Sequence, residues 1–228
     1  SSRRLPVNLC LDSVLDETDL ARVREMLTGA SWQAGADTAG WNARPVKANR
    51  QASHTAAAEL IEKALARHRL FQAAALPARM RPPLFSSYGP GMAYGNHVDN
   101  AVMGGGSLST SRVDLAMTLF LSNSADYEGG VLELETHEGT SAYKLEAGQA
   151  LLYPATMIHR VTEVESGERH AAIIWVQSLV RDAARREILF DLDTVRRRLW
   201  EKAMGAPSPE FDLLNKSYSN LLRAWAEP

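Results

Sequence analysis

The chain has 228 residues, enough for one large domain with a sizeable core, which excludes a disulfide-stapled miniprotein. Apolar residues make up 45% and charged residues 23%, a balance that excludes general disorder. The formal net charge of −2 is too balanced for nucleic acid to be a main partner.

No feature of the sequence points to a membrane or to an oxidising compartment. No apolar run approaches the roughly 18 residues that cross a bilayer. The opening residues, SSRRLPVNLC, lack the apolar segment of a signal peptide, and the single cysteine, Cys10, has no partner for a disulfide within the chain. We therefore expect a cytoplasmic protein without a membrane partner.

The first third of the chain is predicted to be mainly helical. Asp16 is typical of a helix N-cap, and an apolar face at helical spacing follows it until Gly29. Residues 31–53 are mixed and allow short strands. A second helix is predicted over residues 55–70, because one face there is apolar.

The middle of the chain is predicted to form strands. Residues 113–121 alternate in the period-two pattern of a half-buried strand. The segments ALLYP (150–154) and AAIIWVQ (171–177) are short and apolar, as fully buried strands are, and DYEGG (126–130) is typical of a turn. Several short strands separated by turns indicate a sandwich or barrel.

The tail returns to a helical pattern. Ile188, Leu192, Val195 and Leu199 are spaced 4, 3 and 4 residues apart, and the same spacing recurs in a second stripe after a break rich in Pro and Gly. The spacing predicts two helices that pack on the barrel, extend it, or form the interface of a homodimer.

Three residues carry a metal-binding pattern. His97 and Asp99 form an H-x-D pair, and on an extended segment residues two apart point to the same side. His159 follows a buried strand. Together these residues would make a two-His, one-carboxylate facial triad, which leaves three positions on iron(II) open for a chelating co-substrate and O₂.

Arg169 and Tyr88 could complete this site. Arg169 lies ten residues after His159, in a segment of 82–180 that has 4 basic and 11 acidic residues. A guanidinium there would pair bidentately with a carboxylate, and the hydroxyl of Tyr88 could bind the same carboxylate.

Long segments around these residues resemble the bacterial PKHD-type hydroxylases, which are related to prolyl 4-hydroxylases. The resemblance rests on PPLFSSYGPGMAYGNHVDNAV, SRVDLAMTLFLSNSADYEGGVLEL and GQALLYPATMIHRVTEVESGERHAAIIWVQSLVRD. It implies a mainly β fold with flanking helices around a double-stranded β-helix (jelly-roll) core. It also implies that His97, Asp99 and His159 bind iron and that Arg169 binds the distal carboxylate of 2-oxoglutarate.

The resemblance implies an Fe(II)- and 2-oxoglutarate-dependent dioxygenase that uses O₂, with ascorbate as a candidate reductant. Such an enzyme hydroxylates an unactivated C–H bond and releases succinate and CO₂. Its substrate would be amino-acid-like, peptidyl or a small metabolite. We expect residues 1–180 to form the dioxygenase domain with its N-terminal helices, and residues 181–228 a C-terminal helical extension.

One segment departs from the family pattern. Where the family usually carries an Arg after the H-x-D stretch, this chain has Met103 and the glycines Gly104–Gly106, at the expected position of a lid over the substrate. The departure leaves the substrate open. A second interpretation also stays open, in which the jelly-roll binds metal structurally, or senses iron or 2-oxoglutarate, without turnover.

Overall fold

The structure is a computed structural model that describes residues 8–38, 44–105, 108–136, 138–206 and 208–227. Among the helices it describes, none is long and apolar enough to cross a membrane.

Five α-helices flank the β-strands. They are α1 (Glu17–Thr28), α2 (Thr55–Arg67), α3 (Arg69–Ala75), α4 (Ala183–Lys202) and α5 (Pro209–Trp225), with 3₁₀ turns η1 (Gly35–Thr38), η2 (Arg44–Val46) and η3 (Ser124–Asp126). Helix α1 confirms its prediction, because the carboxylate of Asp16 accepts the backbone N–H of Asp19 at 2.8 Å and the helix ends before Gly29.

The single helix predicted over residues 55–70 was wrong at its C-terminal end. The chain leaves helical geometry at His68, which has φ −78° and ψ 101°, and α3 starts at the next residue. The imidazole Nδ1 of His68 accepts the backbone N–H of Phe71 at 3.2 Å, so this side chain caps the new helix. The apolar pattern continues through the break because both helices bury residues against the same sheet.

The strands form two main antiparallel sheets and two small ribbons. The large sheet runs β1 (Leu9–Leu11), β14 (Ala150–Pro154), β10 (Leu115–Phe120), β17 (Arg169–Ser178), β6 (Leu84–Tyr88), β4 (Arg50–Ala52) and β2 (Gln33–Ala34), with β5 (Pro77–Met80) also paired to β17. The small sheet runs β13 (Gly139–Tyr143), β12 (Leu132–Thr136), β15 (His159–Val161), β7 (Ala93–His97) and β3 (Lys47–Ala48). The ribbons are β11 (Tyr127–Gly129) with β16 (Val164–Gly167), and β8 (Val102–Gly105) with β9 (Leu108–Arg112).

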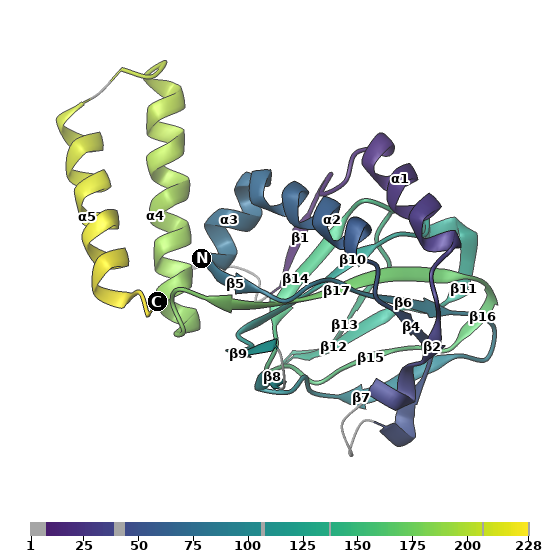
Figure 1. Ribbon diagram of the computed structural model, residues 1–228. Coiled ribbons are helices and arrows are strands. Elements are labelled where there is room, and N and C mark those ends of the chain that lie inside the picture. The colour runs from purple at the N-terminus through teal and green to yellow at the C-terminus, as the bar shows by residue number, and fades with distance from the viewer. Residues whose placement is uncertain (1–7, 39–43, 106–107, 137, 207, 228) are drawn as a thin grey trace.

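Two apolar layers hold the sheets and helices together. Helices α1 to α3 cover the outer face of the large sheet (Figure 1), where Leu119 and Ile174 meet residues such as Ile61. A second layer between the two sheets includes Phe120 and Leu134. The architecture is the predicted mainly β fold with flanking helices.

The strand predicted over residues 113–121 is present as β10, but both of its faces are buried. Met117 packs under the helices, whereas Ala116 and Phe120 lie between the sheets. Alternate side chains of β10 therefore point into two different buried layers, and neither face of the strand is exposed to solvent. Thr118, on the inner face, lines the cavity described below.

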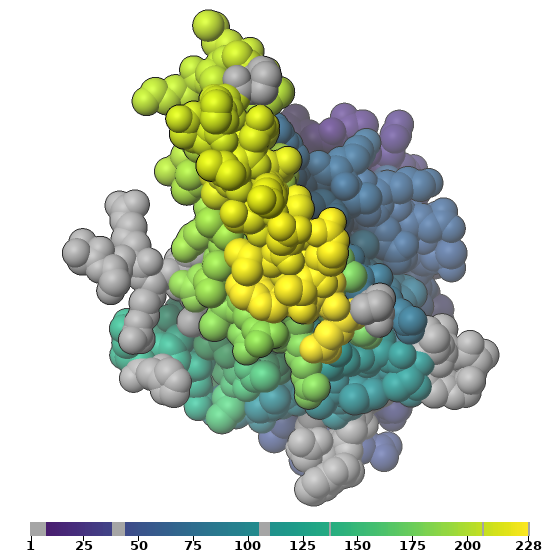
Figure 2. Space-filling model, turned by 90° about the vertical axis from the view of Figure 1, so that its left-hand side faces the viewer, coloured from purple at the N-terminus to yellow at the C-terminus, as the bar shows by residue number. Residues whose placement is uncertain are grey.

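Helices α4 and α5 form a hairpin beside the two sheets, and its far end projects beyond them (Figures 1 and 2). A buried carboxylate on α4 orders the contact between the two helices: Asp193 accepts hydrogen bonds from Arg196 and Arg197 of the same helix. Arg196 also donates to Asn215 on α5 at 2.7 Å and stacks over the ring of Tyr218 at 4.1 Å. Asp193 thus positions the cation that connects the two helices.

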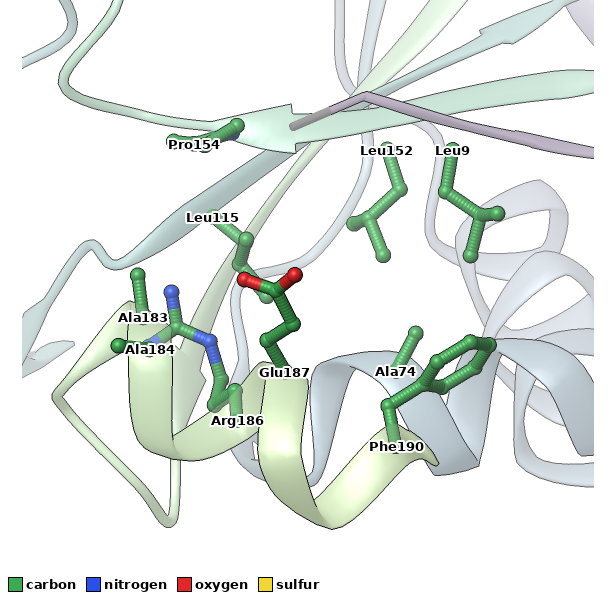
Figure 3. Close-up of a pocket in the computed structure, with 10 residues that line it drawn as sticks. All are labelled: Leu9, Ala74, Leu115, Leu152, Pro154, Ala183, Ala184, Arg186, Glu187 and Phe190. Carbon is green, nitrogen blue, oxygen red and sulfur yellow. The ribbon is translucent and has the colours of Figure 1, made fainter. Parts of the chain in front are cut away.

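The foot of α4 meets the large sheet around an apolar pocket of about 240 Å³ (Figure 3). Leu9, Leu115 and Leu152 line it from the strands, and Phe190 lines it from the helix, next to Ala74. The side chains near this pocket are closely packed: Leu189 of α4 lies in a buried cluster with Tyr218 of α5.

Replacing Asp193 by Ala should destabilise the hairpin, because two guanidinium groups would lose their shared acceptor. We expect a loss of about 1–3 kcal/mol in the free energy of unfolding, measured by chemical denaturation. Hydrogen exchange should show the faster opening in α4 and α5. The matched change Glu201→Ala, at an exposed position on the same helix, should stay within about 0.5 kcal/mol. Equal stabilities of the two variants would contradict the role given to Asp193.

Candidate metal and carboxylate site

Strand pairing in the small sheet brings the predicted metal ligands together. In the register of β7 and β15, His97 lies directly opposite His159. Asp99 follows two residues after the end of β7. One potential ligand atom from each of the three residues lies within 4.8 Å of the others. Two imidazoles and one carboxylate at this separation can share one ion.

Backbone hydrogen bonds fix the orientation of both imidazoles. Nδ1 of His97 lies 2.8 Å from the carbonyl oxygen of Gly95, and Nδ1 of His159 lies 3.0 Å from that of Met157. A carbonyl oxygen only accepts, so each Nδ1 carries a proton, and in the neutral imidazole Nε2 then presents a lone pair. This is the tautomer that a metal ligand needs.

Burial keeps His97 neutral. It lowers the pKa of His97 to about 3, together with the nearby His159. The ring of Tyr94 stacks on His97 with the centroids 3.6 Å apart, which restricts the rotation of the imidazole. A neutral, fixed imidazole can coordinate a metal without first losing a proton.

The surroundings of Asp99 shift the pKa of its carboxyl group in opposite directions. Burial raises the pKa of its carboxyl group, while His159, the indole N–H of Trp175 and the ammonium of Lys47 oppose the rise. The Oδ2 atom of Asp99 and the Nε1 atom of Trp175 are both buried, and neither makes a hydrogen bond of good geometry with a described residue. A cation placed at the triad would favour the ionised carboxylate.

Arg169 is the most unusual side chain in the same cavity. It is only 1% exposed, and its three nitrogens have no hydrogen-bond partner among the described residues. Its guanidinium lies over the rings of Tyr88 and Phe120, at 5.2 and 5.4 Å. A buried cation without a counter-charge is costly, so this position favours an anionic ligand.

Neighbouring strands place aromatic hydroxyls beside this cation. Arg169 and Tyr88 are opposite each other in the register of β17 and β6. Burial raises the pKa of Tyr88 and of Tyr127, and the nearby guanidinium opposes the rise in both cases. Gly130 has φ +60°, and a Cβ there would lie 3.0 Å from Cδ of Arg169, so the glycine lets the chain pass close to this side chain.

Sequence reasoning missed a polar row on one wall of the cavity. Lys47, Asn49 and Gln51 are buried and line the cavity with the triad and Arg169. Burial lowers the pKa of Lys47 to about 8, and its ammonium lies 5.1 Å from the centroid of Tyr94. The sequence pattern K-x-N-x-Q could have revealed this row, because alternate residues of an extended segment face one side.

The other histidines and the glycine segment lie apart from these contacts. His54 and His68 cap helices, and His170 packs beside Trp32, so none of the three lines the cavity. Gly104 belongs to the ribbon of β8 and β9. Gly106 and His137 lie outside the described residues.

Comparison with known proteins agrees with this geometry. Residues 83–177 match the family model of the 2OG-Fe(II) oxygenase superfamily, and residues 182–227 match that of the PKHD-type hydroxylase C-terminal domain. A PKHD-type hydroxylase from Acaryochloris marina is 49% identical over 96% of this chain and 99% of its own length. Another from Synechococcus elongatus is 48% identical over the same shares.

Solved structures show the same fold at low sequence identity. A Pseudomonas putida prolyl-4-hydroxylase is 16% identical and aligns with a TM-score of 0.55, over 75% of this chain and 92% of its own. The viral collagen prolyl hydroxylase of Paramecium bursaria Chlorella virus-1 is 15% identical, with a TM-score of 0.54 over 75% and 96%. The core is therefore the double-stranded β-helix of these oxygenases. The chain belongs to the PKHD-type hydroxylases and is an Fe(II)- and 2-oxoglutarate-dependent enzyme.

Proposed function

We propose that His97, Asp99 and His159 bind the iron and that Arg169, assisted by Tyr88, binds the distal carboxylate of 2-oxoglutarate. We further propose hydroxylation of an unactivated C–H bond in an amino-acid-like, peptidyl or small-metabolite substrate, with release of succinate and CO₂. The division into a dioxygenase domain over residues 1–180 and a helical extension over 181–228 is part of the same proposal.

The observation that carries these roles is the buried guanidinium of Arg169 in the cavity of the triad. A structural metal site has no use for a second, unpaired cation beside it. A dicarboxylate that reaches both the metal and Arg169 would neutralise that cation and gain charge-assisted hydrogen bonds. The donors also fit iron, because two imidazoles and one carboxylate leave coordination positions free.

Each protein group then has a defined task. Bound iron with 2-oxoglutarate and O₂ supplies the oxidising chemistry. The backbone carbonyls behind His97 and His159 hold their Nε2 atoms toward the metal, and Trp175 faces the Asp99 carboxylate. Tyr88 and Phe120 enclose Arg169 and keep water away from the ion pair that it forms with the co-substrate.

The polar wall supports the proposed substrate class. Lys47, Asn49 and Gln51 present an ammonium group and two amides to the cavity. Neither amide atom of Asn49 has a hydrogen-bond partner among the described residues. Such a wall suits substrates with carboxylate or amide groups, which amino acids and peptides carry. A purely apolar substrate would leave the amide of Asn49 unsatisfied.

The direct test is anaerobic. Fe(II) and then 2-oxoglutarate are added to the metal-free chain, and the visible spectrum is recorded. Chelation of a facial-triad iron by the 2-oxo acid should produce a weak charge-transfer band, and candidate substrates should perturb it. A protein with bound metal that shows no band on addition of 2-oxoglutarate would overturn the proposed site.

Asp99→Ala should abolish the metal site, because only two imidazoles would remain. We expect the affinity for Mn(II), measured by calorimetry, to fall by more than roughly a hundredfold. This exceeds the loss of affinity caused by removing only a hydrogen-bond partner of a metal ligand. Consumption of 2-oxoglutarate should cease. Asp37→Ala, at an exposed carboxylate outside the cavity, is the control. A native rate of 2-oxoglutarate consumption in Asp99→Ala would make the triad assignment wrong.

Arg169→Leu should weaken the binding of 2-oxoglutarate and leave the metal site intact. Losing a buried charge-assisted pair costs about 3 kcal/mol, which corresponds to roughly a hundredfold rise in KM for 2-oxoglutarate. Mn(II) affinity should stay within a few-fold of the native value. The matched control is Arg160→Leu, since that guanidinium is half exposed and pairs with Glu133 at 2.6 Å. An unchanged KM in Arg169→Leu would refute the role of this side chain.

A further inference from the structure

Helix α4 carries an apolar stripe that neither α5 nor the sheets cover. Ile188, Val195 and Leu199 are 46%, 47% and 38% exposed. At 3.6 residues per turn, their spacing of seven and four residues places them on one face of the helix. Leu192 lies at the edge of this α4 stripe and is partly buried toward α5.

The contacts of the hairpin use a different face of α4. Leu189 and Arg196 make them, through the buried cluster with Tyr218 and the hydrogen bond to Asn215. Trp200 follows on that side, 5.0 Å from the ring of Phe211. The α4 stripe therefore remains open after the hairpin has formed. Figures 1 and 2 both show the far half of the hairpin projecting beyond the sheets, where a large partner could reach it.

Charges beside the α4 stripe are ordered along the helix. Asp191 lies in its N-terminal half, whereas Arg198 and Lys202 lie in its C-terminal half, on the same flank. All three are exposed, and none forms an ion pair with another described residue. Asp191 and Arg198 are two turns apart, too far to pair within one helix. The flank thus presents one negative and one positive end.

We propose that two copies of the chain form a homodimer in which their α4 stripes pack antiparallel across a two-fold axis. This direction places Ile188 of each copy opposite Leu199 of the other, and Leu192 opposite Val195. It also places Asp191 of each copy opposite Arg198 of the other. In a parallel arrangement this flank would face the opposite flank of the other copy, so Asp191 and Arg198 would not pair with each other. The charges on this flank complement those of an identical flank only when the two helices run in opposite directions. A second copy of the chain therefore fits this surface.

The proposal concerns assembly and does not depend on the chemistry of the cavity. Helix α4 has 20 residues and is about 30 Å long. A single pair of crossing helices buries an area at the small end of specific interfaces, so we expect a Kd on the order of micromolar. The interface joins the hairpins and leaves the strands of the site unobstructed.

Sedimentation velocity of the full chain over roughly 1–100 μM, a range chosen to span that Kd, tests the proposal. The native chain should pass from monomer to dimer. Val195→Glu should raise Kd at least tenfold, because it places a carboxylate in the middle of the stripe. The matched control is Leu213→Glu on α5, where the native side chain is 64% exposed and lies outside the stripe; this variant should dimerise normally. Circular dichroism checks that both variants fold.

Charge reversal tests the direction of packing. Asp191→Arg and Arg198→Asp should each weaken the dimer at least tenfold, because each creates like-charged contacts on both sides of the axis. The double variant keeps the net charge and restores opposite pairs, so it should dimerise as the native chain does. A native chain that stays monomeric, a dimer that tolerates Val195→Glu, or a double variant that fails to recover would overturn the proposal.

Discussion

The site depends on the register of two short pairs of antiparallel strands. Pairing of β7 with β15 sets His97 opposite His159, and pairing of β6 with β17 sets Tyr88 opposite Arg169. A slip of one residue in either pair would turn a functional side chain to the other face of its sheet. The apolar layer between the sheets specifies these registers, because any slip would also expose its residues.

The cavity combines a neutral metal-binding group with a buried cation. Burial keeps His97 neutral and ready to coordinate, while the buried guanidinium of Arg169 has no hydrogen-bond partner in the described part of the chain. The buried charge of Arg169 is unfavourable in an empty cavity and favourable in one that holds a dicarboxylate. Preorganisation of this kind costs stability in the unliganded chain and reduces the reorganisation needed on binding.

Much of the site followed from the sequence. Chain order and spacing were enough to select His97, Asp99, His159 and Arg169, since metal-binding and carboxylate-binding groups are chemically distinctive. The polar row that begins at Lys47 escaped notice because its 50-residue separation from the triad in the chain hides their proximity. Such proximity depends on sheet order, which local patterns do not encode.

Other features of the fold were less accessible to sequence reasoning. Alternation in β10 indicated two different faces but not that another sheet covers the second face. The helix break at His68 depends on an imidazole that folds back on the next turn, a geometry that helical periodicity does not reveal. The stripe on α4 was visible, yet only the structure distinguished its open face from the face that packs on α5.

The proposed binding of 2-oxoglutarate by Arg169 would also link the lifetime of the protein to its co-substrate. A ligand that binds only the folded chain adds about 2.7 kcal/mol of stability at a hundred times its Kd. Chains that lack 2-oxoglutarate would then unfold more often, and unfolded chains are the ones that cellular proteases remove. The abundance of this hydroxylase would then follow the supply of 2-oxoglutarate, with no separate regulatory domain required.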